Sequence, residues 1–309
     1  MSWHLYSLTF RLKSPLHLGF HKVMHLFRTR EYVTAKAFWG ALTAKLTRGL
    51  ALADYEKVGE FLKAAMRFGY FYLYDRDKNI VFTPKYTDDG LKFGNSEEKG
   101  ISQNEFEKRY ISSLASTSIE AYSFTAEEGM LHEVEFISPY TMDEGEPIFL
   151  RGLLWVSEIS DNELSVVGFE ENDFSIVYGK RQVKFSELID TLQVGGERRY
   201  GFGLLKREGK PKKEEDSDLS KLGFWGRWEG RENEIYLEIE KDIPIWSHVK
   251  YTSDLKIKGS IEPVVGRDWS NKGAGRELST YGLCWSPGSI LIEEETFKVM
   301  QDFGIWVKE

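Results

Sequence analysis

Two histidines early in the chain have the side chains and spacing for proton-transfer chemistry. His21 and His25 lie four residues apart in a segment rich in Lys and Arg. Paired imidazoles can act as base and acid in metal-independent cleavage of RNA, because the 2′-hydroxyl must lose a proton while the leaving oxygen gains one. Pro15 and Gly19 predict a loop here, and loop histidines in a basic segment more often contact phosphate or solvent. Cleavage and simple binding both stay open.

A glycine-rich segment in the second half could bind phosphate. The stretch "VGGERRYGFGLLKRE", residues 194 to 208, concentrates small, basic and aromatic residues: Gly195, Gly196, Arg198, Arg199, Tyr200, Gly201 and Gly203. Glycines permit positive φ angles and close backbone approach, so their amide groups could face an anion between the two arginines. The tyrosine offers a ring on which an unpaired base could stack. A tight turn between two strands explains the same glycines equally well.

The net charge of −8 conceals a strongly basic segment. Between residues 10 and 50 there are eight Lys or Arg and one acidic residue, whereas acid is concentrated at 88–107, 127–146 and 214–218. A basic face on an acidic body is typical of a protein that binds one polyanion. The alternative is a solvated helix face, which explains the later lysines better than the arginines. The cations expected to contact nucleic acid are Lys22, Arg28 and Arg30, with Arg267, Lys272 and Arg276 from a second glycine-rich loop.

The sequence lacks the motifs of disulfide-bonded, zinc-binding, nucleotide-binding and serine-hydrolase proteins. A single cysteine, Cys284, permits no internal disulfide and indicates a reducing compartment. One cysteine and scattered histidines supply no zinc-ligand pairs at the usual spacing. The glycine loop matches neither a phosphate-binding P-loop nor a dinucleotide fingerprint, and no Gly-x-Ser-x-Gly elbow occurs. The N-terminus reads as a strand, and no segment approaches the roughly 20 apolar residues of a membrane span. We expect a cytoplasmic protein without metal, cofactor or membrane association.

The pattern of elements predicts an α+β protein. A strand at 3–12, a basic loop, helices at 34–50 and about 55–67, and an aromatic strand from Tyr70 form a βαβ beginning. Thr34 is the expected N-cap of the first helix. A charged surface insertion is expected at 87–107, a short helix capped by Ser186 at 185–193, and a linker at 208–218. These elements predict two α+β units, 1–138 and 139–309, each an antiparallel sheet backed by helices.

Three segments together resemble the RAMP superfamily, the ferredoxin-like RNA-binding proteins of CRISPR–Cas systems. "GGERRYGFG" is similar to the superfamily's glycine-rich loop, and "TSIEAYSFTAEEGMLHEVEF" (117–136) resembles its paired strands. "SPLHLGF" followed by "TAKAFWGALTAKL" resembles the first strand, loop and helix of members from type III effector complexes. The resemblance implies tandem ferredoxin-like (RRM-like) domains and an RNA ligand.

The position of the glycine loop distinguishes subgroups within this resemblance. In repeat-cleaving enzymes the loop lies near the C-terminus, whereas about 100 residues follow it here. The tail, with "YGLCWSPGSILI", resembles the subunits that bind the 5′ handle of the guide RNA. The implied function is a non-catalytic subunit that holds this handle and docks on the large and backbone subunits. The alternative is a metal-independent endoribonuclease that processes repeat RNA with His21 or His25.

Overall fold

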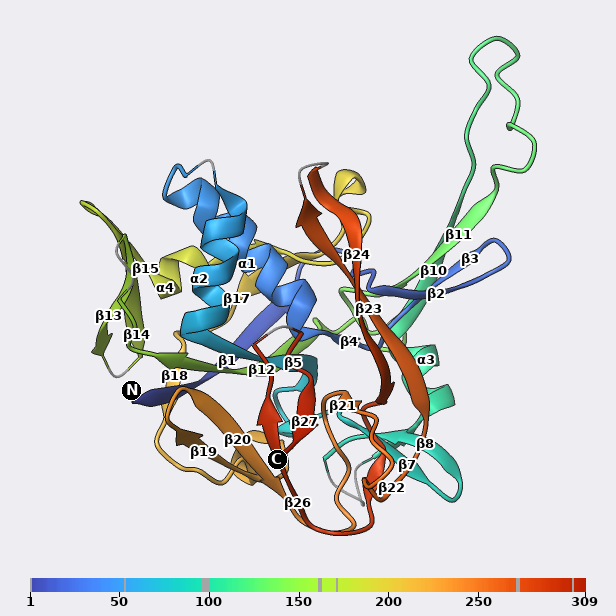
Figure 1. Cartoon of the computed structure of the whole chain (residues 1–309). Helices are drawn as coiled ribbons and strands as arrows, with labels where there is room; N and C mark the ends of the chain where they lie inside the picture. Colours follow the sequence, from blue (N-terminus) through green and yellow to red (C-terminus); the bar gives the residue numbers. More distant parts are fainter. Residues whose placement is uncertain are drawn as a thin grey trace.

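The computed structural model describes residues 2–309 except 53, 96–99, 161–162, 171, 271–272 and 302. Helices and mostly antiparallel strands alternate in the first two thirds, and strands dominate the last third (Figure 1). The predicted α+β class is confirmed.

A four-stranded antiparallel unit forms the centre of the molecule. Its strands are β1 (Trp3–Leu12), β5 (Met66–Asp75), β12 (Phe149–Ser157) and β17 (Leu204–Arg207), hydrogen-bonded in the order β17-β1-β12-β5. With helices following the first and third of these strands, this is the order of a split β-α-β-β-α-β unit. Short strands β16 (Thr191–Gln193), β18 (Lys212–Glu214), β4 (Tyr32–Val33) and β6 (Ile80–Val81) extend the sheet at its margins.

The sheet draws strands from both sides of the boundary expected at residues 138/139. β1 pairs with β12 over nine residue pairs from Trp3↔Ser157 to Arg11↔Phe149, and β18 pairs with β1 at Leu5, Tyr6 and Ser7. The expected linker at 208–218 therefore contributes a strand to the central sheet. The division into two units stays a prediction.

Helices α1 (Ala35–Gly49) and α2 (Tyr55–Ala65) cover one face of the sheet. The Thr34 side chain accepts a hydrogen bond from the Ala37 amide, which confirms the predicted N-cap. Phe38 on α1 stacks on Phe71 of β5 with ring centroids 4.4 Å apart. The later helix α4 (Phe185–Leu188) is a single turn whose N-cap residue is Lys184, without a side-chain cap; Ser186 lies inside the turn, and its hydroxyl donates to Asp173. The predicted cap at Ser186 is therefore wrong.

A seven-stranded sheet from the C-terminal part packs on the other side of the central sheet. Its order is β19 (Arg227–Arg231), β20 (Glu234–Ile239), β26 (Glu295–Val299), β27 (Trp306–Lys308), β21 (Val249–Lys250), β24 (Gly273–Trp285) and β23 (Ile261–Ser270). Trp246 joins the layers: it stacks on Trp155 of β12 and its carbonyl accepts from the Tyr72 hydroxyl of β5. The described residues beyond Arg207 contain no α-helix, only the short 3-10 helix η2 (Ser220–Leu222) and strands, including β22 (Ile257–Lys258) and β25 (Ile290–Leu291). The second ferredoxin-like unit is not confirmed.

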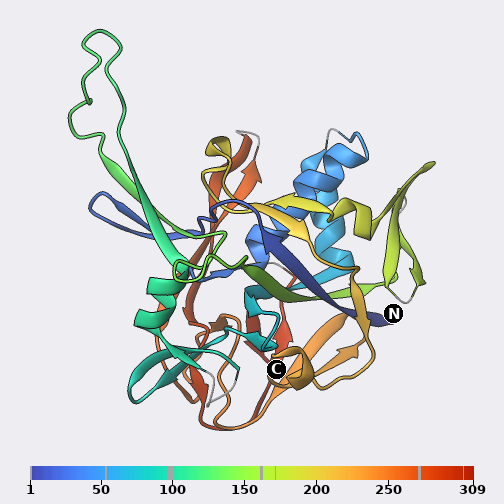
Figure 2. The same ribbon diagram turned by 180° about the vertical axis from the view of Figure 1, so that it is seen from behind.

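Two hairpins leave the body together as a separate sheet. β2 (Gly19–Val23) and β3 (Leu26–Thr29) join β10 (Ile111–Ser116) and β11 (His132–Ile137) in the order β10-β11-β3-β2. β11 runs parallel to β3, with Glu133 opposite Leu26. We call residues 111–137 the arm; Figures 1 and 2 show its loop, 117–131, projecting far from the body.

The segment expected to be a charged surface insertion is folded. It contains β7 (Pro84–Thr87), β8 (Gly90–Phe93), β9 (Ile101–Ser102) and α3 (Gln103–Tyr110). Phe93 stacks on Phe106 at 4.1 Å, and both rings are buried. A further small sheet consists of β13 (Leu164–Glu170), β14 (Asp173–Tyr178) and β15 (Arg181–Lys184).

Candidate nucleic-acid interface

The glycine-rich loop lies between β16 and β17 and packs against the segment that joins β1 to β2. The Gly196 amide donates to the His17 carbonyl at 2.8 Å, and the Gly203 amide donates to the Pro15 carbonyl at 2.7 Å. Gly195 and Gly203 have φ angles of 85° and 80°, and a Cβ would lie 2.4 Å from the His17 carbonyl oxygen and 1.8 Å from that of Val194, respectively. Glycine is required because two backbone segments touch there.

Three of the four glycine amides expected to face an anion, those of Gly196, Gly201 and Gly203, are already bonded to carbonyl groups of the chain. The Gly201 amide donates to the Arg198 carbonyl, just as the Gly196 amide is used by His17. A backbone donor already bonded within the chain cannot bind an anion without breaking that bond. These three glycines therefore shape the loop, and binding of an anion by its backbone stays a prediction.

Side chains of the loop are exposed on the short 3-10 helix η1 (Arg198–Tyr200). Both guanidinium groups point into solvent, and neither has an ion pair with any described residue. Tyr200 is 80% exposed, whereas Phe202 is buried against Phe136, with ring centroids 5.5 Å apart. The loop thus presents two unpaired cations and one free aromatic ring.

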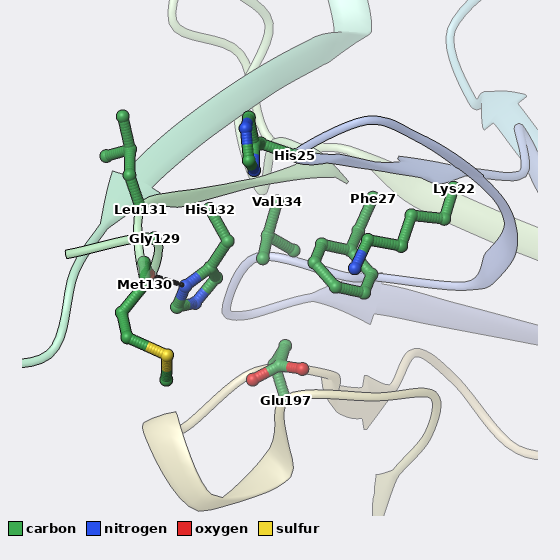
Figure 3. Close-up of a pocket in the computed structure, with 9 residues that line it drawn as sticks. All are labelled: Lys22, His25, Phe27, Gly129, Met130, Leu131, His132, Val134 and Glu197. Carbon is green, nitrogen blue, oxygen red and sulfur yellow. Dashed lines mark hydrogen bonds between the residues drawn. The ribbon is translucent and has the colours of Figure 1, made fainter.

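The loop, hairpin β2–β3 and the arm border an open hollow of about 290 Å³ (Figure 3). From the hairpin and the arm, Lys22, Phe27, His132 and Val134 face the loop, and Glu197 faces them from the loop. Its other lining residues are His25, Gly129, Met130 and Leu131. The hollow therefore gathers three segments that are far apart in the sequence.

The two histidines proposed as a pair are separated. The hollow includes His25 but not His21, which pairs across the hairpin with Arg28, one position away from the pair Lys22↔Phe27 that lines the hollow. Neighbouring positions of a strand point to opposite faces, so His21 points away. His132 lies near His25 instead, with its Nδ1 3.1 Å from the Met130 carbonyl. Sequence reasoning missed His132 and Glu197, for which nothing in the local sequence gave a signal.

Arg28 and Arg30, also expected to contact nucleic acid, have carboxylate partners in the protein. Arg28 Nε donates to Glu135 at 3.2 Å, with Glu107 3.7 Å from the guanidinium. Arg30 binds both oxygens of Glu262 at 2.9 and 3.2 Å. Bidentate arginine–carboxylate pairs are among the stronger polar contacts in proteins. Contact of these two residues with RNA stays a prediction, and the structure gives both a role inside the fold.

The Arg30–Glu262 ion pair belongs to a buried network at the base of hairpin β2–β3. Glu262 accepts from His248 Nε2 at 2.7 Å, and His248 Nδ1 accepts from the Tyr70 hydroxyl at 2.7 Å. Burial lowers the pKa of His248, so the imidazole is neutral and its one proton lies on Nε2. Burial alone would raise the pKa of Glu262, but hydrogen bonds from His248 and Arg30 outweigh it and lower the pKa to about 2. The network joins the hairpin to the C-terminal sheet.

The second glycine-rich basic segment forms the end of hairpin β23–β24. Arg267 and Arg276 are exposed, and Arg267 donates to the Gly275 carbonyl at 3.1 Å. Lys272 lies outside the described residues. The end of this hairpin and the loop with η1 project from the same side of the molecule (Figures 1 and 2).

The described residues contain no helix that is both long and apolar enough to cross a membrane. They also contain no group of three His, Cys, Asp or Glu that could hold a metal ion.

These features define an α+β protein with a split β-α-β-β-α-β sheet and a glycine-rich loop before its last strand. A family model described as the RAMP superfamily matches residues 9–206, and the chain belongs to that superfamily.

Solved structures share the fold. A chain in the cryo-EM structure of the type III-B Cmr-β complex bound to cognate target RNA and AMPPnP, state 1, has a TM-score of 0.55 at 12% identity, covering 92% of this chain and 85% of that one. A chain in Cmr-β bound to cognate target RNA has a TM-score of 0.53 at 12% identity, covering 92% and 86%. No curated protein sequence matches.

Proposed function

We propose that this chain is a non-catalytic RNA-binding subunit of a type III CRISPR effector complex, active in the cytoplasm, and that it holds the 5′ handle of the guide RNA. Membership of the RAMP superfamily and the fold shared with chains of RNA-bound Cmr-β complexes support the class of protein. The position of the glycine loop, well before the C-terminus, supports the handle-binding role.

One observation carries the proposal: the glycine-rich loop presents unpaired cations and an exposed aromatic ring next to Glu197, which lines the hollow together with Lys22. Arg198 and Arg199 have no carboxylate partner among the described residues, and Tyr200 is available for stacking. Lys22, on the facing hairpin, lies 4.6 Å above the Phe27 ring and likewise has no carboxylate partner in the described chain. Single-stranded RNA is bound by cations along its backbone and by rings that stack its unpaired bases.

Exposed apolar side chains offer surfaces for the neighbouring subunits. Tyr122 and Phe124 in the arm loop are 98% and 83% exposed. On hairpin β23–β24, Val265 and Leu278 are also exposed. Apolar groups that find no core in the isolated chain are typical of contact surfaces in an assembly. We therefore assign docking of the large and backbone subunits to the arm and to hairpin β23–β24.

Removal of the two loop arginines tests RNA binding. We expect Arg198→Ala/Arg199→Ala to weaken binding of single-stranded RNA and to make the slope of log K against log salt shallower by about 1.4, because each lost phosphate contact contributes about 0.7. The matched control is Lys241→Ala/Lys258→Ala, which removes two exposed lysines. An unchanged salt slope in the arginine variant would show that the loop does not bind the backbone. Guide RNA that co-purifies with the wild-type chain would support the handle-binding role.

A second candidate function is metal-independent cleavage of repeat RNA, because His25 and His132 line the same hollow. Incubation of the purified chain with repeat RNA in EDTA separates the two functions. Cleavage at one position that is lost in His25→Ala/His132→Ala would establish the endoribonuclease. Retention of intact RNA supports the binding subunit.

A further inference from the structure

The hollow holds polar groups that have no hydrogen-bond or ion-pair partner in the described protein. The carboxylate of Glu197, the ring of His25 and the ammonium group of Lys22 make no side-chain hydrogen bond or ion pair there. Glu197 itself has a left-handed backbone with φ 50°, a conformation that non-glycine residues adopt rarely. A carboxylate held in this way over a hollow is positioned to accept hydrogen bonds from a ligand.

The size and walls of the hollow suit one flat aromatic group. Its volume of about 290 Å³ is at the lower limit of small-molecule sites, which measure about 300 to 1,000 Å³. Phe27 and His132 form part of the wall in an edge-to-face contact, with ring centroids 6.1 Å apart, and Val134 lies beside them, so a base could stack on one of the two rings (Figure 3). Aromatic and apolar walls bind the faces of nucleobases, because every base has a π-face to bury.

We propose that the hollow binds one unstacked guanine base of the RNA, with its N1–H and N2–H groups donating to the carboxylate of Glu197. This inference rests on the RNA-binding function proposed above. An ionised carboxylate only accepts hydrogen bonds and has two oxygens side by side. On its Watson–Crick edge guanine presents two adjacent donors, so it makes two parallel bonds, the strong bidentate arrangement.

The other three bases fit this carboxylate less well. Adenine and cytosine place a single amino donor beside a ring nitrogen that accepts, and uracil places one N–H between two carbonyl oxygens. In each case a lone pair faces the second carboxylate oxygen, which is repulsive. The O6 and N7 atoms of guanine accept hydrogen bonds, and Lys22 is the cation on the facing wall that can donate to them.

Two arginines that follow Glu197 in the chain compensate for the repulsion between its carboxylate and the RNA phosphates. Arg198 and Arg199 come next in the chain and are exposed. They can bind the phosphates on either side of the captured base, which would otherwise be repelled by a carboxylate. The loop thus combines two functions: its arginines bind any sequence, and Glu197 selects the base.

Fluorescence anisotropy with labelled ten-nucleotide RNAs tests the proposal. The probes are oligouridylate and the same oligomer with one central G, inosine, A or C. We expect the G probe to bind the full chain at least about fivefold more tightly than oligouridylate, the lower end of the range for a bidentate base contact. Inosine, which lacks the N2 amine, should lose most of this gain, and A and C should show none.

The decisive variant is Glu197→Gln, which keeps the size of the side chain but replaces one accepting oxygen by a donor. We expect its preference for G to disappear while its affinity for oligouridylate stays equal or rises. Glu187→Gln, which neutralises an exposed carboxylate on α4, is the matched control and should keep the preference. Equal binding of all probes by the wild type, or a preference that survives Glu197→Gln, would overturn the guanine site and leave the RNA-binding function standing. Failure to bind any probe, at low salt, would overturn both.

Discussion

The buried network of Arg30, Glu262, His248 and Tyr70 at the base of hairpin β2–β3 should contribute strongly to the stability of the fold. The Arg30 and Glu262 side chains are 13% and 21% exposed, and His248 is fully buried. Glu262→Gln preserves the shape of the network but leaves the Arg30 guanidinium buried opposite a neutral amide. Removal of one partner of a buried ion pair destabilises a protein strongly, because the remaining charge has lost both water and its counter-charge.

The magnitude follows from the acidity of Glu262. Its pKa falls from an ordinary 4.5 to about 2, which corresponds to about 3 kcal/mol of folding free energy at neutral pH. Breaking a buried pair costs about 3 to 5 kcal/mol, in agreement with this value. Because the folded-state pKa is the lower one, this stability is fully present above pH 4.5 and is lost as the pH falls toward 2.

Urea unfolding between pH 7 and pH 2.5 measures both effects. Glu262→Gln should lose about 3 kcal/mol at pH 7, and its acid-induced loss of stability below pH 4.5 should be smaller than that of the wild type. Glu293→Gln is the matched control, because the Lys256–Glu293 pair is more than half exposed on both sides, is screened by solvent and should contribute little to stability. A loss below about 1 kcal/mol for Glu262→Gln, or acid profiles that coincide, would refute the role assigned to this network.

Two further predictions concern backbone contact and thiol burial. Gly203→Ala should destabilise the fold by at least about 2 kcal/mol more than Gly201→Ala in a thermal or urea melt. Both glycines have left-handed φ angles, but only at Gly203 would the new Cβ strike a backbone oxygen. Equal losses of stability in the two variants would show that this close backbone approach is unimportant. Burial, with Glu262 nearby, raises the pKa of the Cys284 thiol from 9 to about 11, so at pH 8 the thiolate should be about a hundredfold scarcer in the folded than in the unfolded chain. A disulfide reagent should therefore modify Cys284 at least about a hundredfold more slowly in the folded chain than in urea. Equal rates of modification in the two states would contradict its burial.

Local patterns in the sequence predicted most elements of the central unit. The alternation of 3–12, the four-residue spacing of apolar residues in α1 and its Thr34 cap each reflect interactions within a few residues. The order of the strands was not accessible in the same way. β12 lies between β1 and β5, and the segment expected to be a linker supplies β18, because pairing partners lie far apart in the sequence.

The candidate site shows the same limit. Exposed cations in the glycine loop could be recognised from residue type alone, and Arg198 and Arg199 are indeed on the surface. Glu197 could not be singled out from the sequence, because its place in the hollow depends on hairpin β2–β3 and the arm, which lie opposite it in the fold. Parallel pairing of β11 with β3, which are separated by more than a hundred residues in the sequence, brings His132 to the hollow. No local sequence pattern predicts this pairing.

The same reasoning explains why the basic segment of the sequence is a poor map of the basic surface. Residues 10–50 carry a large positive excess, but folding brings carboxylates from distant segments onto several of these cations. Arg28 meets Glu135, Arg30 meets Glu262, and Lys36 forms an ion pair with Asp268. A cation neutralised within the fold has little field left for a polyanion, whereas an unpaired one keeps it. The charge pattern of the sequence therefore pointed to hairpin β2–β3. The ion pairs of the fold leave Lys22 and the two loop arginines as the better candidates for the proposed RNA contact.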